Sequence, residues 1–140
     1  MTPAARLQAA IGITDRWLAG EGLLDRLLTL WGRESRYAGS GDRRAVADLV
    51  YDAVRRLRSA AWVAGVEEPA DGRATLLGSL VLDGIGAAER DSLFSGVGYG
   101  PEPLSGTEAS RLGRPLDAAP AAVRLDLPDW LLAHLDHVPE

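Results

Sequence analysis

The stretch from Arg36 to Arg58 contains the residues of this chain whose types and spacing are best suited to binding a ligand. A guanidinium binds phosphate in a bidentate way, and an aromatic ring stacks on an unpaired base. Residues spaced alternately four and three apart lie on the same flank of an expected helix. This flank comprises Arg44, Asp48, Tyr51, Arg55, Arg58 and Trp62, and Arg43 and Arg56 lie close beside it. The pattern indicates an RNA-binding surface.

A solvated helix face is the alternative interpretation of the same residues. Asp48 and Asp52 would then form surface ion pairs with neighbouring arginines, which contribute little to stability. Tyr51 and Trp62 would pack beneath a neighbouring helix. The residue types alone leave both interpretations open.

The segment before this helix adds Arg33, Arg36 and Tyr37, followed by Ala-Gly-Ser-Gly-Asp. It brings basic groups and backbone amides to the start of the helix, and helix N-termini favour anions. The alternative is that Asp42 caps the helix and occupies the amides that a phosphate would need.

The sequence gives little support to a metal site, a dinucleotide-binding site or a catalytic site. The chain has no cysteine, which excludes disulfides and thiolate metal sites, and His134 and His137 have no further ligand nearby, so we expect no metal site. The glycines of residues 96–100 follow no strand and precede Pro101, so the dinucleotide-binding pattern fails. We assign no catalytic residue, and we expect helix caps or surface positions for three carboxylates, Asp83, Glu89 and Asp91.

The elements that position these residues are all expected to be helices, because apolar residues recur at helical spacing and no alternating run predicts a strand. The third helix has an apolar stripe from Val46 to Ala61, and the fourth is apolar enough for the centre of a bundle. The expected helices run from Thr2 to Gly20, from Leu23 to Gly32, from Ser40 or Asp42 to Gly65, and from Asp71 to Leu82.

The character of the sequence changes after Gly86. A short helical turn near residues 89–94 leads into a loop rich in glycine and proline, and Ser105 with Glu108 predicts a capping box that opens another short helix. We therefore expect a helical domain over residues 1–86 and a loop-rich connector over residues 87–140.

Charge is distributed unevenly, although the net charge is −5. All 15 basic residues are arginine, and residues 33–62 hold seven of them against four acids, whereas residues 63–140 hold five against 13 acids. A local basic face can still bind a polyanion, because salt screens charges beyond about 8–10 Å. The sequence predicts neither a secretion signal nor a membrane span, and we expect a cytoplasmic protein.

Three segments in order resemble a known family. RESRYAGSGDRRAVADLVYDAVRRLRS is similar to the N-terminal domain of the Sun or Fmu-type family of rRNA cytosine-5 methyltransferases. DSLFSGVGYGPEPLSGTEASRL resembles the region that follows this domain, and LDLPDWLLAHL resembles the segment leading into the catalytic domain. The likeness covers roughly residues 4–135.

The resemblance implies an all-α, NusB-like helical bundle that helps to seat a methyltransferase on ribosomal RNA. It implies S-adenosylmethionine and two catalytic cysteines in a downstream domain, so we expect this chain alone to hold no cofactor and to methylate nothing. The implied partners are ribosomal RNA and the protein's own methyltransferase domain, without membrane or DNA. The implied RNA contacts are Arg36, Arg43, Arg44, Arg55, Arg56, Arg58, Tyr37, Tyr51 and Trp62, and the implied interdomain contacts are Pro128, Trp130 and Leu131.

Two other functions remain open on the sequence. The bundle could be a protein-docking module, in which case the aromatic flank would be the sensitive surface. It could also be a structural support for the catalytic domain, with the segment PDWLL as a clamp.

Overall fold

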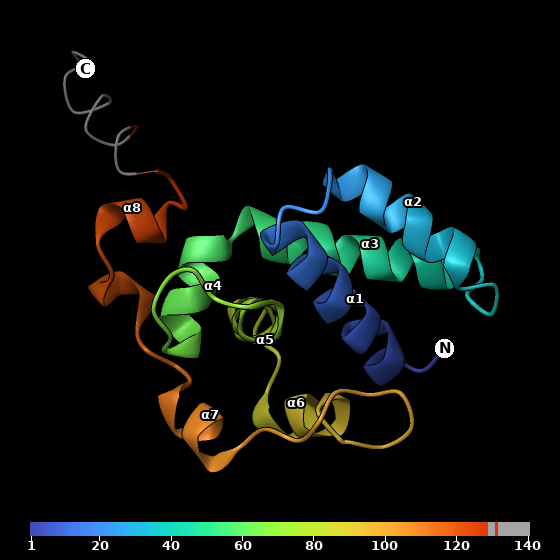
Figure 1. Ribbon diagram of the computed structural model, residues 1–140. Coiled ribbons are helices and arrows are strands. Elements are labelled where there is room, and N and C mark those ends of the chain that lie inside the picture. The colour runs from blue at the N-terminus through green and yellow to red at the C-terminus, as the bar shows by residue number, and fades with distance from the viewer. Residues whose placement is uncertain (129–130, 132–140) are drawn as a thin grey trace.

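A computed structural model describes residues 1–128 and residue 131 of the chain, and within them the protein is an all-α bundle, as the sequence predicted (Figure 1). Six helices precede residue 100, and shorter elements follow them. In chain order the elements are α1 (Pro3–Leu18), α2 (Leu24–Glu34), α3 (Ser40–Arg55), α4 (Leu57–Ala64), α5 (Gly72–Leu82), α6 (Ala87–Leu93), α7 (Gly106–Arg111), the 3-10 turn η1 (Leu116–Ala118) and α8 (Ala121–Arg124).

Side-chain N-caps begin two of the long helices at the residues that the sequence predicted. Thr2 Oγ1 accepts a hydrogen bond from the Ala5 amide at 3.1 Å, with Pro3 in the first turn of α1. Asp71 Oδ1 accepts from the Ala74 amide at 2.8 Å and begins α5. Both predicted starts are confirmed.

Helix α5 occupies the centre of the bundle, as its apolar sequence predicted. Figure 1 looks nearly along its axis, with α1, α3 and α4 around it, and it packs against all three. Its contact with α4 is very close, because a methyl group placed on Gly78 would lie only 2.0 Å from the carbonyl oxygen of Ala60. Glycine at this position lets the two backbones meet, and Leu76, Leu77 and Leu80 fill the core beside it.

The expected single helix from Ser40 to Gly65 is wrong, because the structure divides it at Arg56 into α3 and α4. The backbone at Arg56 leaves the helical region, with φ −122° and ψ 32°. An Asp126 carboxylate enters the break and accepts hydrogen bonds from the Ser59 amide at 2.9 Å and the Ser59 hydroxyl at 2.6 Å. Asp126 thereby takes an amide that a continuous helix would direct to the carbonyl of Arg55.

The helix ends show one further difference from the sequence prediction. Gly65 ends α4 as expected, with φ +76°, a left-handed conformation that favours glycine. Gly32, in contrast, does not end α2, which continues to Glu34.

Residues after Gly86 pack closely against the helices before them. Phe94 lies in the hydrophobic core with only 2% of its surface exposed, and the guanidinium of Arg73 lies 5.0 Å from the centre of its ring. Helices α7 and α8 both contact α4. The domain boundary at residue 86 stays a prediction, while the connector contributes to the same core as the bundle.

The predicted capping box at α7 is confirmed and extended by an ion pair. The Ser105 hydroxyl accepts from the Glu108 amide at 3.1 Å, and Glu108 accepts from the Ser105 amide at 2.9 Å. Arg73 of α5 also reaches Glu108, with 2.8 Å between Nε and Oε2. This link fixes α7 to the central helix.

No helix within residues 1–128 is long and apolar enough to cross a membrane.

The ion pair between Arg73 and Glu108 should make stability depend on pH. The hydrogen bond from Arg73, aided by those from Ser105, lowers the pKa of Glu108 from 4.5 to about 2 against the opposing effect of burial. A carboxyl group with a lowered pKa stabilises the fold above its ordinary pKa and loses that contribution as the pH falls toward its folded value. We expect Glu108→Gln to lower the free energy of unfolding by about 1–2 kcal/mol at pH 7 and by much less near pH 2.5. Urea unfolding at both pH values measures this, and equal losses at both would contradict the assignment.

Candidate nucleic-acid interface

Two of the predicted RNA-binding arginines have structural partners within the fold. Arg56, at the break between α3 and α4, donates to the Asp52 carbonyl at 3.0 Å, to Asp83 at 2.9 Å and to the hydroxyl of Ser79. Arg58 donates to Glu68 at 2.9 Å and to the Leu127 carbonyl at 2.8 Å. These contacts hold α3 and α4 against α5 and the end of the connector.

The two aromatic residues of the predicted flank are also engaged. The Tyr51 hydroxyl donates to Asp25 of α2. The Trp62 indole donates to the Pro115 carbonyl at 2.8 Å, and the guanidinium of Arg114 lies 3.7 Å from the centre of its ring. The break at Arg56 therefore directs Trp62 toward the connector.

The remaining predicted residues are accessible to solvent. Arg36, Arg43 and Arg44 are exposed, and Tyr37 is 74% exposed on the segment between α2 and α3. Arg55 is exposed and donates to Asp52 in the same helix turn. The flank expected on one helix is thus distributed over several parts of the surface.

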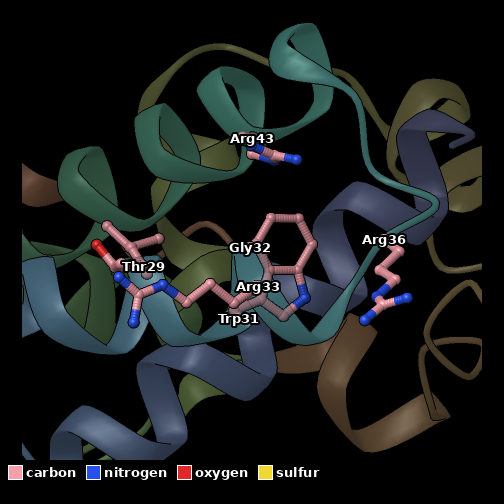
Figure 2. Close-up of a pocket in the computed structure, with 7 residues that line it drawn as sticks. Thr29, Trp31, Gly32, Arg33, Arg36 and Arg43 are labelled. Atoms are coloured by element: carbon pink, nitrogen blue, oxygen red, sulfur yellow. The ribbon is translucent and has the colours of Figure 1, made fainter.

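A cavity with three arginines in its lining lies between α2 and the start of α3, and we call it the α2–α3 pocket. Its volume is about 590 Å³, and its lining comprises Leu28, Thr29, Trp31, Gly32, Arg33, Arg36 and Arg43. Figure 2 shows the Trp31 indole in the middle of this lining, with the guanidiniums of Arg33 and Arg36 on opposite sides and Arg43 across from it on α3. The pocket combines an aromatic surface with three cations.

Local structure explains how these groups meet. Arg43 lies across Gly32, where an added methyl group would be 3.5 Å from Cδ of the arginine. The continuation of α2 past Gly32 places Arg33 on its last turn, and the chain then reverses direction through a segment anchored by buried Ser35 and Ala38. The Ala38 amide donates to the Ser35 carbonyl at 2.9 Å, which closes the turn.

The carboxylate at the start of α3, that of Asp42, is ion-paired within the fold. Asp42 pairs with Arg6 at 2.7 Å and with the terminal amine of Met1 at 3.6 Å, and it accepts from the Gly39 amide at 3.0 Å. The hydrogen bonds from Arg6 and from Gly39 lower the pKa of Asp42. Among the described residues, Arg33, Arg36 and Arg43 have no carboxylate within ion-pair distance, so the pocket is locally positive.

The helix start itself is less suited to an anion than the arginines. Asp42 is the third residue of α3, and its carboxylate accepts from the Gly39 amide. The N-cap residue is Gly39, so the predicted cap at Ser40 or Asp42 is wrong. The charge of the Asp42 carboxylate opposes a second anion at the remaining amides.

A second groove has the opposite character. It has a volume of about 370 Å³ and lies between α1, α3 and the region of α6, where Asp48, Asp52 and Glu89 accompany apolar side chains such as Leu49 and Leu93. Its carboxylates would repel a polyanion. The two surfaces that meet α3 therefore differ in charge.

The predicted interdomain residues lie at the end of the described chain. Pro128 is exposed, and its carbonyl accepts from the Leu131 amide at 3.0 Å. Trp130 lies outside the described residues, as do His134 and His137. In the described part of the chain, no group of three or more histidines and carboxylates could hold a metal ion.

Sequence reasoning missed Trp31 as a site residue, because its helical spacing placed it among the core positions. It does pack partly against the core, yet it also lines the pocket. Arg33, two residues after Trp31, was the available signal, since an arginine and a tryptophan in the last turn of a helix both lie near the following turn.

Comparison with models of protein families, with curated proteins and with solved structures found no match to this chain.

Alanine substitutions at the neighbouring residues Arg55 and Arg56 compare an exposed arginine with one that holds helices together. Arg56→Ala should lower the free energy of unfolding by about 1–3 kcal/mol, because it removes hydrogen bonds to α5 and leaves their acceptors unpaired. Arg55→Ala should change it by less than about 0.5 kcal/mol, because Arg55 is exposed. Urea denaturation followed by circular dichroism measures both, and an equal effect of the two substitutions would contradict the roles assigned.

Proposed function

We propose that this chain is an RNA-binding domain and that the α2–α3 pocket is its contact surface. The observation that carries the proposal is that Arg33, Arg36 and Arg43 line one pocket with the Trp31 indole and have no carboxylate partner among the described residues. Arginine forks and an accessible aromatic surface are the groups that RNA-binding proteins use for phosphates and unpaired bases. Arg44 and Tyr37, both exposed, extend the same end of the molecule.

Within this proposal the domain is the NusB-like accessory domain of an rRNA cytosine-5 methyltransferase. The resemblance of three sequence segments supports it, and an all-α bundle is compatible with it. Methyl transfer would then belong to a downstream domain that binds S-adenosylmethionine, and residues 128–131 would lead toward that domain. Ribosomal RNA in the cytoplasm would be the target.

Charge favours RNA binding at the α2–α3 pocket over binding at the other groove. The α2–α3 pocket has three arginines in its lining, whereas the second groove has three carboxylates, of which Asp52 is paired with Arg55, and a single arginine, Arg6, which is paired with Asp42. A polyanion is attracted to the first and repelled by the second. The local basic surface would thereby allow a chain whose net charge is −5 to bind RNA.

A salt titration with a structured rRNA fragment tests the proposal. We expect the affinity of the wild-type domain to fall steeply with salt. Arg36→Ala with Arg43→Ala should weaken binding and reduce the log–log slope by about 0.7–0.9 for each phosphate that the variant no longer binds. The matched control is Arg111→Ala with Arg124→Ala, which removes the same charge from exposed positions in α7 and α8, far from the loop between α2 and α3 in Figure 1.

The two double variants should differ in RNA affinity if the surface is correctly assigned. The control should bind nearly as the wild type does. Equal losses in both variants would show that RNA responds only to total charge, and the absence of binding by the wild type at low salt would contradict RNA binding itself. Thermal unfolding of each variant establishes that it is folded.

A further inference from the structure

We propose that the α2–α3 pocket accepts a single unpaired nucleotide, with its base against the Trp31 indole and its phosphate between Arg36 and Arg43. The inference rests on the proposed RNA-binding function and narrows its ligand from RNA in general to an extruded or bulged nucleotide. Its basis is a pocket lined by an aromatic ring, with Arg36 and Arg43 on two sides of that ring and Arg33 extended toward Thr29 (Figure 2).

The cavity has the dimensions of a small-molecule site. Its volume of about 590 Å³ falls within the range of about 300–1,000 Å³ that is usual for ligand pockets. A flat basic surface would serve a phosphate backbone equally well, so a recess of this size points to insertion of a group larger than a phosphate.

The Trp31 side chain is placed as a fixed surface for stacking. It is partly buried, and it packs against the hydrophobic core while also lining the pocket. A ring held in this way loses little conformational freedom when a base stacks on it. Stacking tolerates every base, because each has a π face.

Hydrogen-bonding groups at the rim match a nucleotide. The Trp31 indole N–H has no hydrogen-bond acceptor among the described residues, and it is not among their buried polar atoms that lack a partner. In Figure 2 it lies on the side of the ring toward Arg36. The Thr29 hydroxyl donates to the Asp25 carbonyl at 2.9 Å, which leaves its oxygen as an acceptor. The pocket therefore offers donors for phosphate or base acceptors and one acceptor for a hydroxyl or an amino group.

A base within a duplex could neither stack on the Trp31 indole nor reach the hydrogen-bonding groups of the pocket. In an A-form duplex both faces of a base are stacked, and the major groove is too deep and narrow for side chains to reach the base edges. Arginines alone would bind duplex and bulged RNA similarly through phosphates. A preference for an unpaired base is thus the property that distinguishes the pocket from a general basic surface.

Three RNA hairpins test the inference on the unaltered protein. One has a fully paired stem, one has a single bulged adenosine in the stem, and one has an abasic residue at the bulge, which keeps the phosphate but removes the base. The two strands of each stem are joined by a linker without nucleobases, so that the bulged adenosine is the single unpaired base in the set. Competition against a labelled rRNA fragment should show the bulged hairpin binding on the order of tenfold more tightly than the other two. Equal affinities would overturn the nucleotide pocket while leaving RNA binding intact.

Substitutions at Trp31 test whether this residue is responsible for the preference for a bulged base. Trp31→Leu should abolish the advantage of the bulged hairpin over the abasic one but retain the salt-dependent binding that Arg36 and Arg43 provide. Trp31→Phe should keep part of the advantage, because a smaller ring still stacks. Persistence of the full advantage in folded Trp31→Leu would overturn the role of this residue.

The hairpins remain decisive even if a Trp31 variant unfolds, because they compare RNAs on the wild-type domain. Absence of binding by all three hairpins and by the rRNA fragment at low salt would overturn both the pocket and the proposed function. Absence of the bulge preference alone would overturn only the pocket.

Discussion

The arrangement of this protein depends on one hydrogen-bonded carboxylate, that of Asp126 at the start of α4. By accepting from both the amide and the hydroxyl of Ser59, it satisfies a donor exposed by the break at Arg56. Asp126 adopts a left-handed backbone, with φ +52°, which aspartate tolerates better than most residues. The contact is partly buried, and the guanidinium of Arg58 reinforces it through the neighbouring Leu127 carbonyl.

The break gives the two halves of the expected helix different tasks. Helix α4 turns onto α5, where Gly78 allows backbone contact with Ala60, and its other side receives the connector. Helix α3 remains beside α1, and its first turns meet the end of α2. Arg43 is therefore kept near Trp31, whereas Arg56 and Arg58 are used to hold the fold together. A single straight helix would have kept Arg44, Arg55 and Arg58 on one flank, as the sequence predicted.

Features that depend on nearby residues could be predicted from the sequence, and those that depend on distant ones could not. The caps formed by Thr2, Asp71 and the pair Ser105 and Glu108 act within one helical turn, so residue spacing is enough to place them. The break at Arg56 leaves no mark in the apolar periodicity, and Asp126, whose carboxylate caps the Ser59 amide at the break, lies 67 residues farther along the chain. The α2–α3 pocket was missed in part for the same reason, since Trp31 lines it only after the chain has reversed direction.

The distance along the chain between Ser59 and Asp126 also has a consequence for biosynthesis. A ribosome that adds about 5–20 residues per second needs roughly 3–13 s to make the intervening 67 residues. During this interval α4 lacks its carboxylate cap, while α1 and α3 already have the first-turn partners that Thr2 and Asp42 supply. The nascent chain therefore passes through a stage in which its N-terminal helices can assemble before Asp126 caps the start of α4.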